Sequence, residues 1–378
     1  MNSKISIYIS IAFLALLLLI SCEKDLIQHD VEVELEEAFE NHDLPSLSVG
    51  IYTRDGMVYS KFMGHANNED EIEASHETIY HIGSISKLFI VTAVMQLEEE
   101  GLLELDEDIS TYLPFDLRHP DFPDIPITTR MLLTHTTGLS WPGSFNSQQG
   151  MWNNFPADEG PAPSEWIPQY LIPSGSQFDA HLWKPLEPGK HERYSNIGTC
   201  VAAYIVEQIS GKNFRDYCKE HIFEPLDMHN TSYNYADLDL EKIALLYDKN
   251  GNPSTYYDNR TYAAGGVKST LHDLSNFASC YLNNGLYEGT QILSKASINN
   301  ILEVQNPASG KCLMWNKYLG GWYGHEGGLD IGTATTFAIH IESKIAMIIF
   351  TNTSNAAVHP GGEIYWLLRQ KANEYIEH

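Results

Sequence analysis

Ser84 and Lys87 are the residues of this chain whose types and spacing first point to chemistry. They stand three positions apart where a strongly amphipathic helical stretch begins, over residues 86–100, so both side chains fall on one helix face. A desolvated lysine there loses its proton and can accept the serine proton, while the helix N-terminus favours the developing negative charge. The alternative is a helix cap beside a surface charge. A cation in the first turn opposes the helix dipole, which favours the catalytic interpretation.

Five stretches of the chain, in a fixed order, carry a resemblance to a known enzyme family. They are Tyr80–Lys87, Thr128–Leu139, Tyr194–Asn196, Ala264–Thr270 and His325–Gly328, and together they cover about residues 40–352. The sequence resembles the serine β-lactamase and penicillin-binding-protein superfamily, specifically its branch of class C β-lactamases, DD-peptidases and esterases. The resemblance implies that Ser84 is the nucleophile and Lys87 its base.

The second motif of that family is Tyr-x-Asn, which occurs here at Tyr194, Tyr257 and Tyr281. Tyr281 lies late in a helical stripe and Tyr257 in a polar loop, whereas Tyr194 directly precedes a predicted helix, as the family motif does. By resemblance, Tyr194 is the third catalytic residue and shares a proton with Lys87, while Asn196 orients the substrate. The alternative is a buried tyrosine beside an asparagine helix cap.

The third family motif is Lys-Thr-Gly or His-x-Gly, and three His-x-Gly candidates begin at His81, His325 and His359. His81 belongs to the nucleophile segment, and the motif at His359 contains a proline, which cannot donate into a sheet. The motif at His325 precedes strand-like sequence and fits. The resemblance implies a substrate-binding segment of His325, Glu326 and Gly327, with an oxyanion hole at the backbone N–H groups of Ser84 and Gly328.

The third motif also departs from the β-lactamase pattern in a way that bears on substrate. Where β-lactamases have a fixed cation and a hydroxyl, this chain has His325, which is only partly charged near neutral pH, and the anionic Glu326. If both face the cleft, a free carboxylate binds poorly. We therefore expect an esterase or D-peptidase acting on ester or amide substrates (peptide or β-lactam-like), rather than an efficient β-lactamase.

Composition excludes several other functions. The chain has 23 Lys+Arg against 50 Asp+Glu, a formal charge of −27, which repels phosphate backbones and excludes nucleic acid as a partner. We find no Gly-x-Ser-x-Gly elbow, no P-loop and no dinucleotide-binding glycine motif after a strand, and no metal-ligand spacing. No metal or cofactor is therefore expected, and the partner is a small-molecule or peptide substrate.

The elements that position these motifs predict an α+β fold. We expect helices near residues 31–42, 86–100, 128–138, 197–209, 214–221, 271–282 and 363–375, and strands at 47–52, 57–62, 333–341 and 345–351. The N- and C-terminal strands then share one antiparallel sheet flanked by helices, and the middle forms a mostly helical lobe. Residues 140–188 are expected to be loops around a cleft between the two parts, where the site lies.

The N-terminus indicates export. Lys4 precedes an apolar run over residues 5–20, short for a membrane span and typical of a signal peptide, and the run ends at Ser21-Cys22. This resembles a lipoprotein processing box, so residues 1–21 are expected to be cleaved, Cys22 lipidated, residues 22–30 a tether, and residues 31–378 the hydrolase domain. A plain signal peptide and an uncleaved signal anchor are the alternatives. The expected location is the cell envelope, periplasmic or on the outer membrane, with a lipid anchor in the membrane.

Several properties stay open in the sequence. An exported chain permits disulfides among Cys200, Cys218, Cys280 and Cys312, but buried free thiols are as consistent with the spacing. The oligomeric state is undetermined. A second function also fits the same motifs: a non-catalytic or acylation-only envelope receptor that binds peptidoglycan-like peptides in the cleft.

Overall fold

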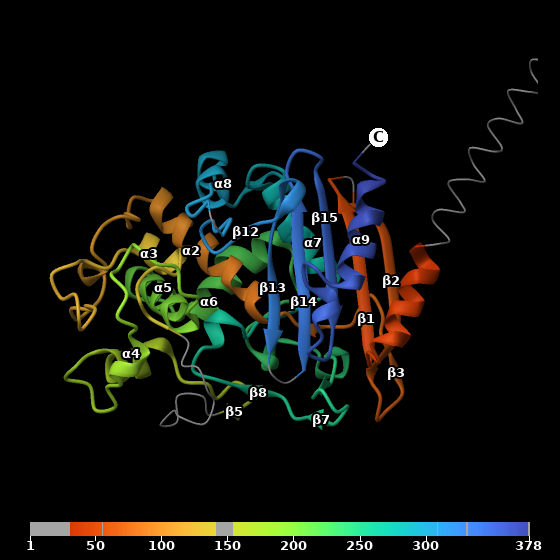
Figure 1. Cartoon of the computed structure of the whole chain (residues 1–378), viewed down its shortest axis with the longest axis horizontal. Helices are drawn as coiled ribbons and strands as arrows, with labels where there is room; N and C mark the ends of the chain where they lie inside the picture. Colours follow the sequence, from red (N-terminus) through yellow and green to blue (C-terminus); the bar gives the residue numbers. More distant parts are fainter. Residues whose placement is uncertain (1–30, 55, 141–153, 308, 330–331, 377–378) are drawn as a thin grey trace, which may run out of the picture.

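One antiparallel sheet joins the two ends of the chain. The computed structural model describes residues 31–54, 56–140, 154–307, 309–329 and 332–376. The sheet has seven strands in the order β12 (Asn316–Lys317), β13 (Trp322–Leu329), β14 (Thr333–His340), β15 (Ile345–Thr351), β1 (Ser46–Thr53), β2 (Gly56–Asn67) and β3 (Ile72–Glu73) (Figure 1). β1 pairs with β15, with Val49 opposite Ile349, so the N-terminal hairpin adjoins the C-terminal one. This confirms the predicted α+β class.

Helices cover both faces of this sheet, which explains its apolar strands. Every residue of β15 is buried, because alternate side chains enter different cores. Met347 and Ile349 pack with the helix at 31–41 and with α9 (Glu363–Asn373). Ile348 and Phe350 face α7 (Leu271–Leu282) and the larger core of the molecule.

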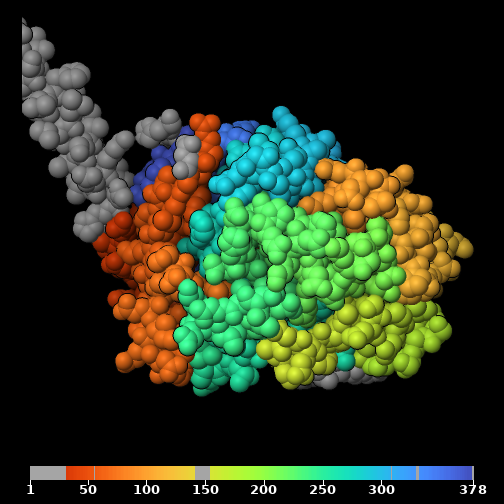
Figure 2. Space-filling view, turned by 180° about the vertical axis from the view of Figure 1, so that it is seen from behind, coloured from red at the N-terminus to blue at the C-terminus, as the bar shows by residue number. Residues whose placement is uncertain are grey.

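The middle of the chain forms the helical lobe. It contains α2 (Lys87–Glu99), α3 (Thr129–Leu133), α4 (Pro163–Leu171), α5 (Asn196–Ser210), α6 (Phe214–Cys218) and α8 (Lys295–Leu302). These helices lie to the left of the sheet in Figure 1. From the opposite side, the green middle segments lie between the orange N-terminal hairpin and the orange and yellow helical segments (Figure 2).

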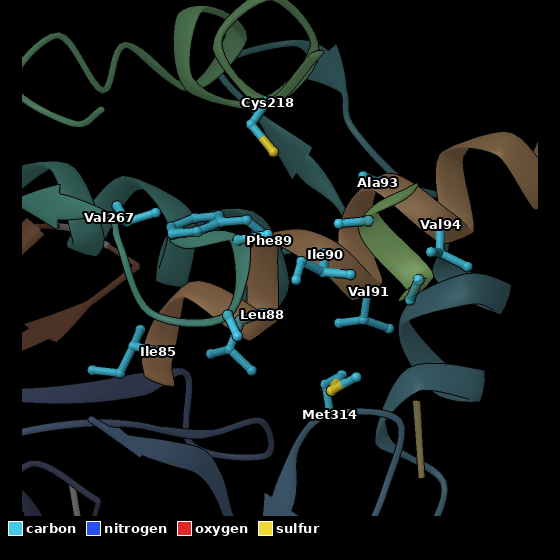
Figure 3. Packing of buried hydrophobic residues seen from close by; sticks show 14 of the residues in the cluster. Ile85, Leu88, Phe89, Ile90, Val91, Ala93, Val94, Cys218, Val267 and Met314 are labelled. Carbon is cyan, nitrogen blue, oxygen red and sulfur yellow. The ribbon is translucent and has the colours of Figure 1, made fainter. Parts of the chain in front are cut away.

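Helix α2 is the centre of the molecule rather than an amphipathic helix at its edge. Its residues from Lys87 to Met95 are all buried, and Leu88, Phe89 and Val91 point to different neighbours, among them Met314 (Figure 3). α2 contacts α5, α6 and α8. The expectation of a strongly amphipathic helix was wrong. Other helices cover α2 on the sides that a surface helix would expose to solvent, so those sides are apolar too.

Most other predicted elements are confirmed, and the exceptions have local causes. α7 and β15 have the predicted bounds, whereas the region 140–188, expected to be loops, contains α4; proline at its first turn starts that helix. α8 was not predicted. The His325 motif lies within β13 rather than before a strand. Residues 141–153 lie outside the described part of the chain.

Pairs of two-residue strands connect the loops outside the large sheet. They are β4 (Tyr80–His81) with β9 (Lys268–Ser269), β5 (Phe155–Pro156) with β8 (Tyr257–Asp258), β6 (Leu246–Tyr247) with β7 (Pro253–Ser254), and β10 (Leu286–Tyr287) with β11 (Thr290–Gln291).

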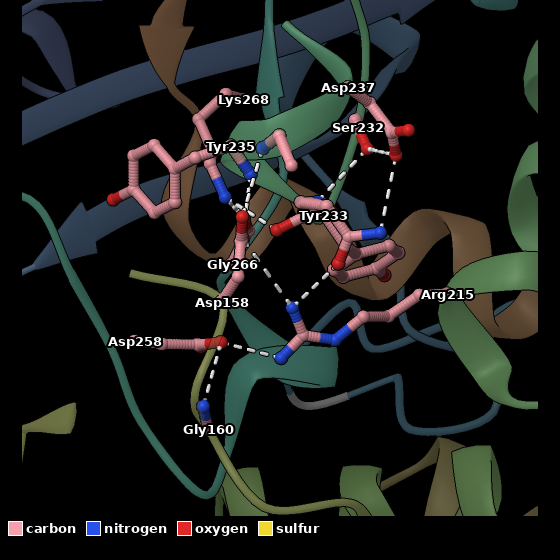
Figure 4. A network of polar contacts seen from close by, with 12 residues as sticks. Asp158, Gly160, Arg215, Ser232, Tyr233, Tyr235, Asp237, Asp258, Gly266 and Lys268 are labelled. Carbon is pink, nitrogen blue, oxygen red and sulfur yellow. Dashed lines mark hydrogen bonds and ion pairs between the residues drawn. The ribbon is translucent and has the colours of Figure 1, made fainter. Parts of the chain in front are cut away.

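A buried ion pair stabilises the region of the β5–β8 contact. Arg215 donates to Asp258 at 2.5 Å and to Asn234 at 2.8 Å, and Asp258 also accepts from the backbone N–H of Gly160 (Figure 4).

The described residues bear on two further expectations. Cys200, Cys218, Cys280 and Cys312 are all buried free thiols. No helix within the described ranges is long and apolar enough to cross a membrane. The predicted signal peptide, Cys22 and the tether fall on residues 1–30, outside the described residues.

Candidate active site

Ser84 stands on a tight turn that is held against the sheet. It lies in the 3₁₀ turn Gly83–Ser86, directly before α2. Gly83 has a φ of +53°, and a Cβ there would lie 2.7 Å from the backbone nitrogen of Gly328. The Thr335 hydroxyl donates to the Ile82 carbonyl at 2.9 Å. The turn therefore packs backbone to backbone on β13, an approach that only glycine permits.

The structure brings Ser84, Lys87 and Tyr194 together. Lys87 Nζ donates to Ser84 Oγ at 2.9 Å and to the carbonyl of Ala264 at 2.8 Å. Tyr194 Oη donates to the same Ser84 Oγ at 2.8 Å. Lys87 Nζ also lies 4.9 Å from the centre of the Tyr194 ring. The serine hydroxyl thus has a base and an acid in direct contact.

Desolvation shifts the pKa of both groups. Lys87 is fully buried, and desolvation lowers the pKa of its amine well below the usual value; the cation of Lys311 acts in the same direction. Desolvation raises the pKa of the Tyr194 phenol, and the hydrogen bond to Ser84 opposes this rise. Desolvation therefore favours a neutral amine and a neutral phenol beside Ser84. Such an amine can accept the serine proton.

The backbone around Tyr194 fixes its ring. The Ser195 side chain caps α5 by accepting from Gly198 N at 3.0 Å, so Asn196 is the first residue of the helix and not its cap. His135, with a φ of +58°, packs its ring 4.7 Å from that of Tyr194. The His135 carbonyl accepts from Arg193 N at 2.7 Å. The other Tyr-x-Asn candidates lie elsewhere, with Tyr281 in the core.

His325 also lies near the Tyr194 ring, with 6.4 Å between the ring centres. It is buried, its Nδ1 lies 2.6 Å from the Glu326 carbonyl oxygen, and its Nε2 has no partner. Asn196 Oδ1 is likewise buried and unpartnered. Desolvation lowers the pKa of His325 well below its usual value, and the positive charge of Lys311 lowers it further. The ring is therefore neutral.

The other residues of the third motif, Glu326, Gly327 and Gly328, differ in where they lie relative to Ser84. Alternation along β13 places Glu326 on the face away from His325, and its carboxylate accepts from Asn316 Nδ2 at 3.2 Å. A Cβ on Gly327 would lie 2.0 Å from the Ile82 carbonyl oxygen, so this glycine allows close packing of the nucleophile turn. The Gly328 backbone nitrogen lies beside that turn, where an oxyanion hole requires it.

Lys311 is a site residue that the sequence analysis missed. It is 4% exposed, and its Nζ donates to Asn316 Oδ1 at 2.7 Å. Its charge lowers the pKa of Lys87, His135 and His325. It stands in a polar loop with no motif, so only its contacts across the chain reveal it. Within the described residues, no group of three or more histidine, cysteine, aspartate or glutamate side chains is arranged to hold a metal ion.

Comparison with known proteins agrees with this geometry. A family model described as Beta-lactamase matches residues 24–370. The chain belongs to the beta-lactamase family. Proteins of this family are generally hydrolases, and the turn that carries Ser84, the Tyr-x-Asn segment and β13 lie within the matched residues.

Relatives within the beta-lactamase family are distant. The chain is 24% identical over 268 residues to D-alanyl-D-alanine-carboxypeptidase/endopeptidase AmpH of Escherichia coli (strain K12), covering 66% of this chain and 63% of AmpH. It is 25% identical over 324 residues to penicillin-binding protein 4* of Bacillus subtilis (strain 168), covering 78% of this chain and 65% of that protein. It thus spans slightly less than two thirds of either relative.

A solved structure shares the fold of this beta-lactamase family member. The octameric penicillin-binding protein homologue from Pyrococcus abyssi superposes with a TM-score of 0.70 at 27% identity, over 86% of this chain and 73% of that one. The superposition shows that the two proteins share not only the α+β class but also the arrangement of the sheet and the helical lobe.

Proposed function

We propose that this protein is a serine hydrolase that forms an acyl-enzyme on Ser84. Ser84 Oγ attacks the carbonyl carbon of an ester or amide, and its proton passes to Lys87 and, through Tyr194, to the leaving group. The backbone N–H groups of Ser84 and Gly328 stabilise the oxyanion. Water then attacks the acyl ester, gives up a proton to the Lys87–Tyr194 pair, and Ser84 regains its hydrogen as the acid is released.

One observation carries this proposal. A fully buried lysine amine at 2.9 Å and a tyrosine hydroxyl at 2.8 Å both contact the same serine oxygen. A lysine that served only as a surface charge or a helix cap neighbour would not be desolvated beside a hydroxyl. Burial of a charged amine without a carboxylate partner costs folding free energy. Such groups with shifted pKa values are found most often at functional sites.

Substitution of Ser84 by alanine tests the proposal. Hydrolysis of p-nitrophenyl esters by Ser84→Ala should fall roughly 10³-fold or more, because the remaining groups offer no nucleophile. Ser275→Ala, on α7, is the matched control and should retain turnover. Unchanged turnover in Ser84→Ala would discard the assignment. A wild-type protein that accumulates an adduct without releasing product would instead be the acylation-only receptor.

The substrate class follows from the third motif. We propose an esterase or D-peptidase rather than an efficient β-lactamase, since a neutral histidine stands where β-lactamases carry a fixed cation. The similarity to AmpH, whose name states a D-alanyl-D-alanine carboxypeptidase and endopeptidase, supports a peptide substrate. Profiling the purified protein against esters, D-amino-acid peptides and nitrocefin tests this. Nitrocefin hydrolysis as efficient as ester hydrolysis would contradict it.

We further propose that the protein is anchored to the cell envelope through lipidated Cys22. The support is the apolar run that ends in Ser21-Cys22. Expression of the full chain in a bacterial host should place it in the membrane fraction, with an N-terminal peptide that carries acyl mass on Cys22. Cys22→Ala should shift it to another fraction or leave it unprocessed. A wild-type N-terminus without acyl mass would contradict the anchor.

A further inference from the structure

His359 begins a His-x-Gly motif that does not lie in a strand, yet its side chain contacts β13. The residue stands between the 3₁₀ turn Ala356–Val358 and α9, and it is half-buried. Its Nε2 lies 3.0 Å from the carbonyl oxygen of Gly327 in β13. A carbonyl oxygen can only accept a hydrogen bond, so Nε2 carries a proton and donates it. His359 therefore supplies a side-chain donor to the backbone of β13.

The bond from His359 falls on a peptide group of the proposed oxyanion hole. The Gly327 carbonyl and the Gly328 N–H belong to the same trans peptide, so the two groups point in opposite directions. A donor on the carbonyl oxygen polarises the whole peptide, because hydrogen bonds that share one peptide strengthen each other. The N–H of Gly328 thus becomes a stronger donor toward a negatively charged oxygen.

The nucleophile turn and His359 hold this peptide from opposite faces of the sheet. A side chain on Gly327 would clash with the carbonyl of Ile82, directly before the turn. A Cβ on Gly328 would instead lie 3.9 Å from His359 Cε1. Successive side chains in a strand point to opposite faces, so the two contacts lie on different sides of β13. Rotation of the peptide is therefore opposed on both sides, which fixes the direction of the Gly328 N–H.

The fold holds the His359 side chain in place. The Val358 carbonyl accepts from the hydroxyl of Thr336 on β14 at 2.7 Å, and Val358 is fully buried. The His359 N–H donates to the Ala356 carbonyl at 3.1 Å, and the His359 carbonyl accepts from Gly362 N at 2.8 Å. The backbone on both sides of the imidazole is thus bonded within the fold, so its contact with β13 is preorganised before a substrate binds.

We propose that His359 is a positioning residue for acyl transfer, and that its Nε2–H orients and polarises the peptide whose Gly328 N–H binds the oxyanion. The inference rests on the proposed function and adds a residue to it. His359 acts through the Gly327 carbonyl rather than on the substrate. The substrate oxygen carries more negative charge in the transition state than in the bound ester, so a stronger Gly328 donor lowers the barrier rather than only tightening substrate binding.

Two substrates that differ in one atom test this role: a p-nitrophenyl ester and the thionoester with sulfur in place of its carbonyl oxygen. Sulfur is the weaker hydrogen-bond acceptor, so the thionoester depends less on the oxyanion hole. His359→Leu should lower kcat/KM roughly tenfold for the ester and less than about threefold for the thionoester, because it weakens one oxyanion donor without removing it. His359→Gln, which keeps an N–H donor, should restore the wild-type ratio of the two rates.

His42→Leu is the matched control, since His42 Nε2 lies 3.0 Å from Glu363 Oε2 at the start of α9, and it should leave both rates unchanged. Equal losses with ester and thionoester in His359→Leu, or no recovery in His359→Gln, would overturn the role of His359 and leave acyl transfer intact. His359→Met, also without a donor, gives the same comparison if His359→Leu does not fold. Absence of wild-type turnover with the ester contradicts the proposed function itself, and the inference falls with it.

Discussion

The chemistry of the site also depends on a charged side chain that does not contact the serine. Lys87 and Tyr194 contact Ser84 directly, but Lys311 contributes to the low pKa of Lys87. Burial lowers the pKa of Lys311 itself, and the nearby carboxylates of Glu192 and Glu326 oppose this effect. A single buried lysine outside the motifs therefore lowers the pKa of the proposed base, Lys87.

Replacement of Lys311 by methionine should move the pH dependence of the reaction. Lys87 acts as a base only when deprotonated, so kcat/KM rises as pH passes the pKa of Lys87 in the free enzyme. The Lys311 charge lowers that pKa, so its removal raises it, and the acidic limb of kcat/KM against pH moves to higher pH. Lys317→Met, on an exposed lysine of β12, is the control. A limb that stays in place while the rate falls at every pH would show that Lys311 acts through packing alone.

Sequence reasoning reaches the residues that carry a local signal and misses those that do not. Ser84 and Lys87 are three positions apart, so their spacing predicted their contact, whereas the contact with Tyr194 was expected from the family resemblance alone. Lys311 has no such spacing to any site residue, and its position depends on where the loop before β12 folds back. His135 stands in a recognised stretch, yet only its ring contact of 4.7 Å with Tyr194 shows its positioning role.

At the scale of elements, the important contact joins the 3₁₀ turn to β13. The turn presents Ser84, and β13 presents His325 on one face and the Gly328 backbone at its far end. Gly83 and Gly327 leave no room for a side chain between them. The register of β13 against β14, with Gly327 opposite Thr335, therefore fixes where the Gly328 N–H of the proposed oxyanion hole lies.

Gly83→Ala should damage both folding and activity. The positive φ alone costs about 1–3 kcal/mol in a residue other than glycine. The added methyl would also lie 2.7 Å from the Gly328 nitrogen and displace it, which should lower acylation roughly 10²-fold. Gly251→Ala has a φ of +79° and no atom within 4 Å, so it controls for backbone strain. Urea unfolding and ester acylation rates measure the two effects. Equal acylation in the two variants would contradict the account.

Periodicity predicted long, regular elements better than short or internal ones. β14, β15, α7 and α9 were predicted within two residues at each end, because their apolar residues alternate or recur without interruption. β13 contains four residues, Gly-His-Glu-Gly, that have low or ambiguous strand propensity, and its tertiary pairing with β14 overrides them.

At the scale of the whole molecule, two hydrophobic cores lie on opposite faces of one sheet. The N-terminal and C-terminal hairpins are neighbours in that sheet. Because β1 and β15 pair, the N-terminal hairpin lies directly beside the C-terminal one in the sheet. The helical lobe meets the sheet through α7, which packs on β1, β14 and β15. Within the middle of the chain, the Arg215–Asp258 pair joins α6 to β8. Side chains of this pair are 9% and 7% exposed.

Asp258→Asn should therefore destabilise the whole molecule. It leaves the buried guanidinium of Arg215 without its principal partner, which costs about 3 kcal/mol in comparable buried pairs. Chemical denaturation at neutral pH measures the change. Asp216→Asn, an exposed carboxylate on the same helix as Arg215, should change stability by less than about 0.5 kcal/mol. Equal effects in the two variants would show that the pair contributes no more than a surface charge.

The most direct measurement for the account is the site of covalent capture. Wild-type protein treated with a fluorophosphonate, digested and mapped by mass spectrometry should carry one adduct, on the peptide that contains Ser84, and Ser84→Ala should carry none. Ester hydrolysis should stop as the adduct forms. An adduct on any other residue, or ester turnover that persists in fully labelled protein, would contradict the assignment of Ser84 as the nucleophile.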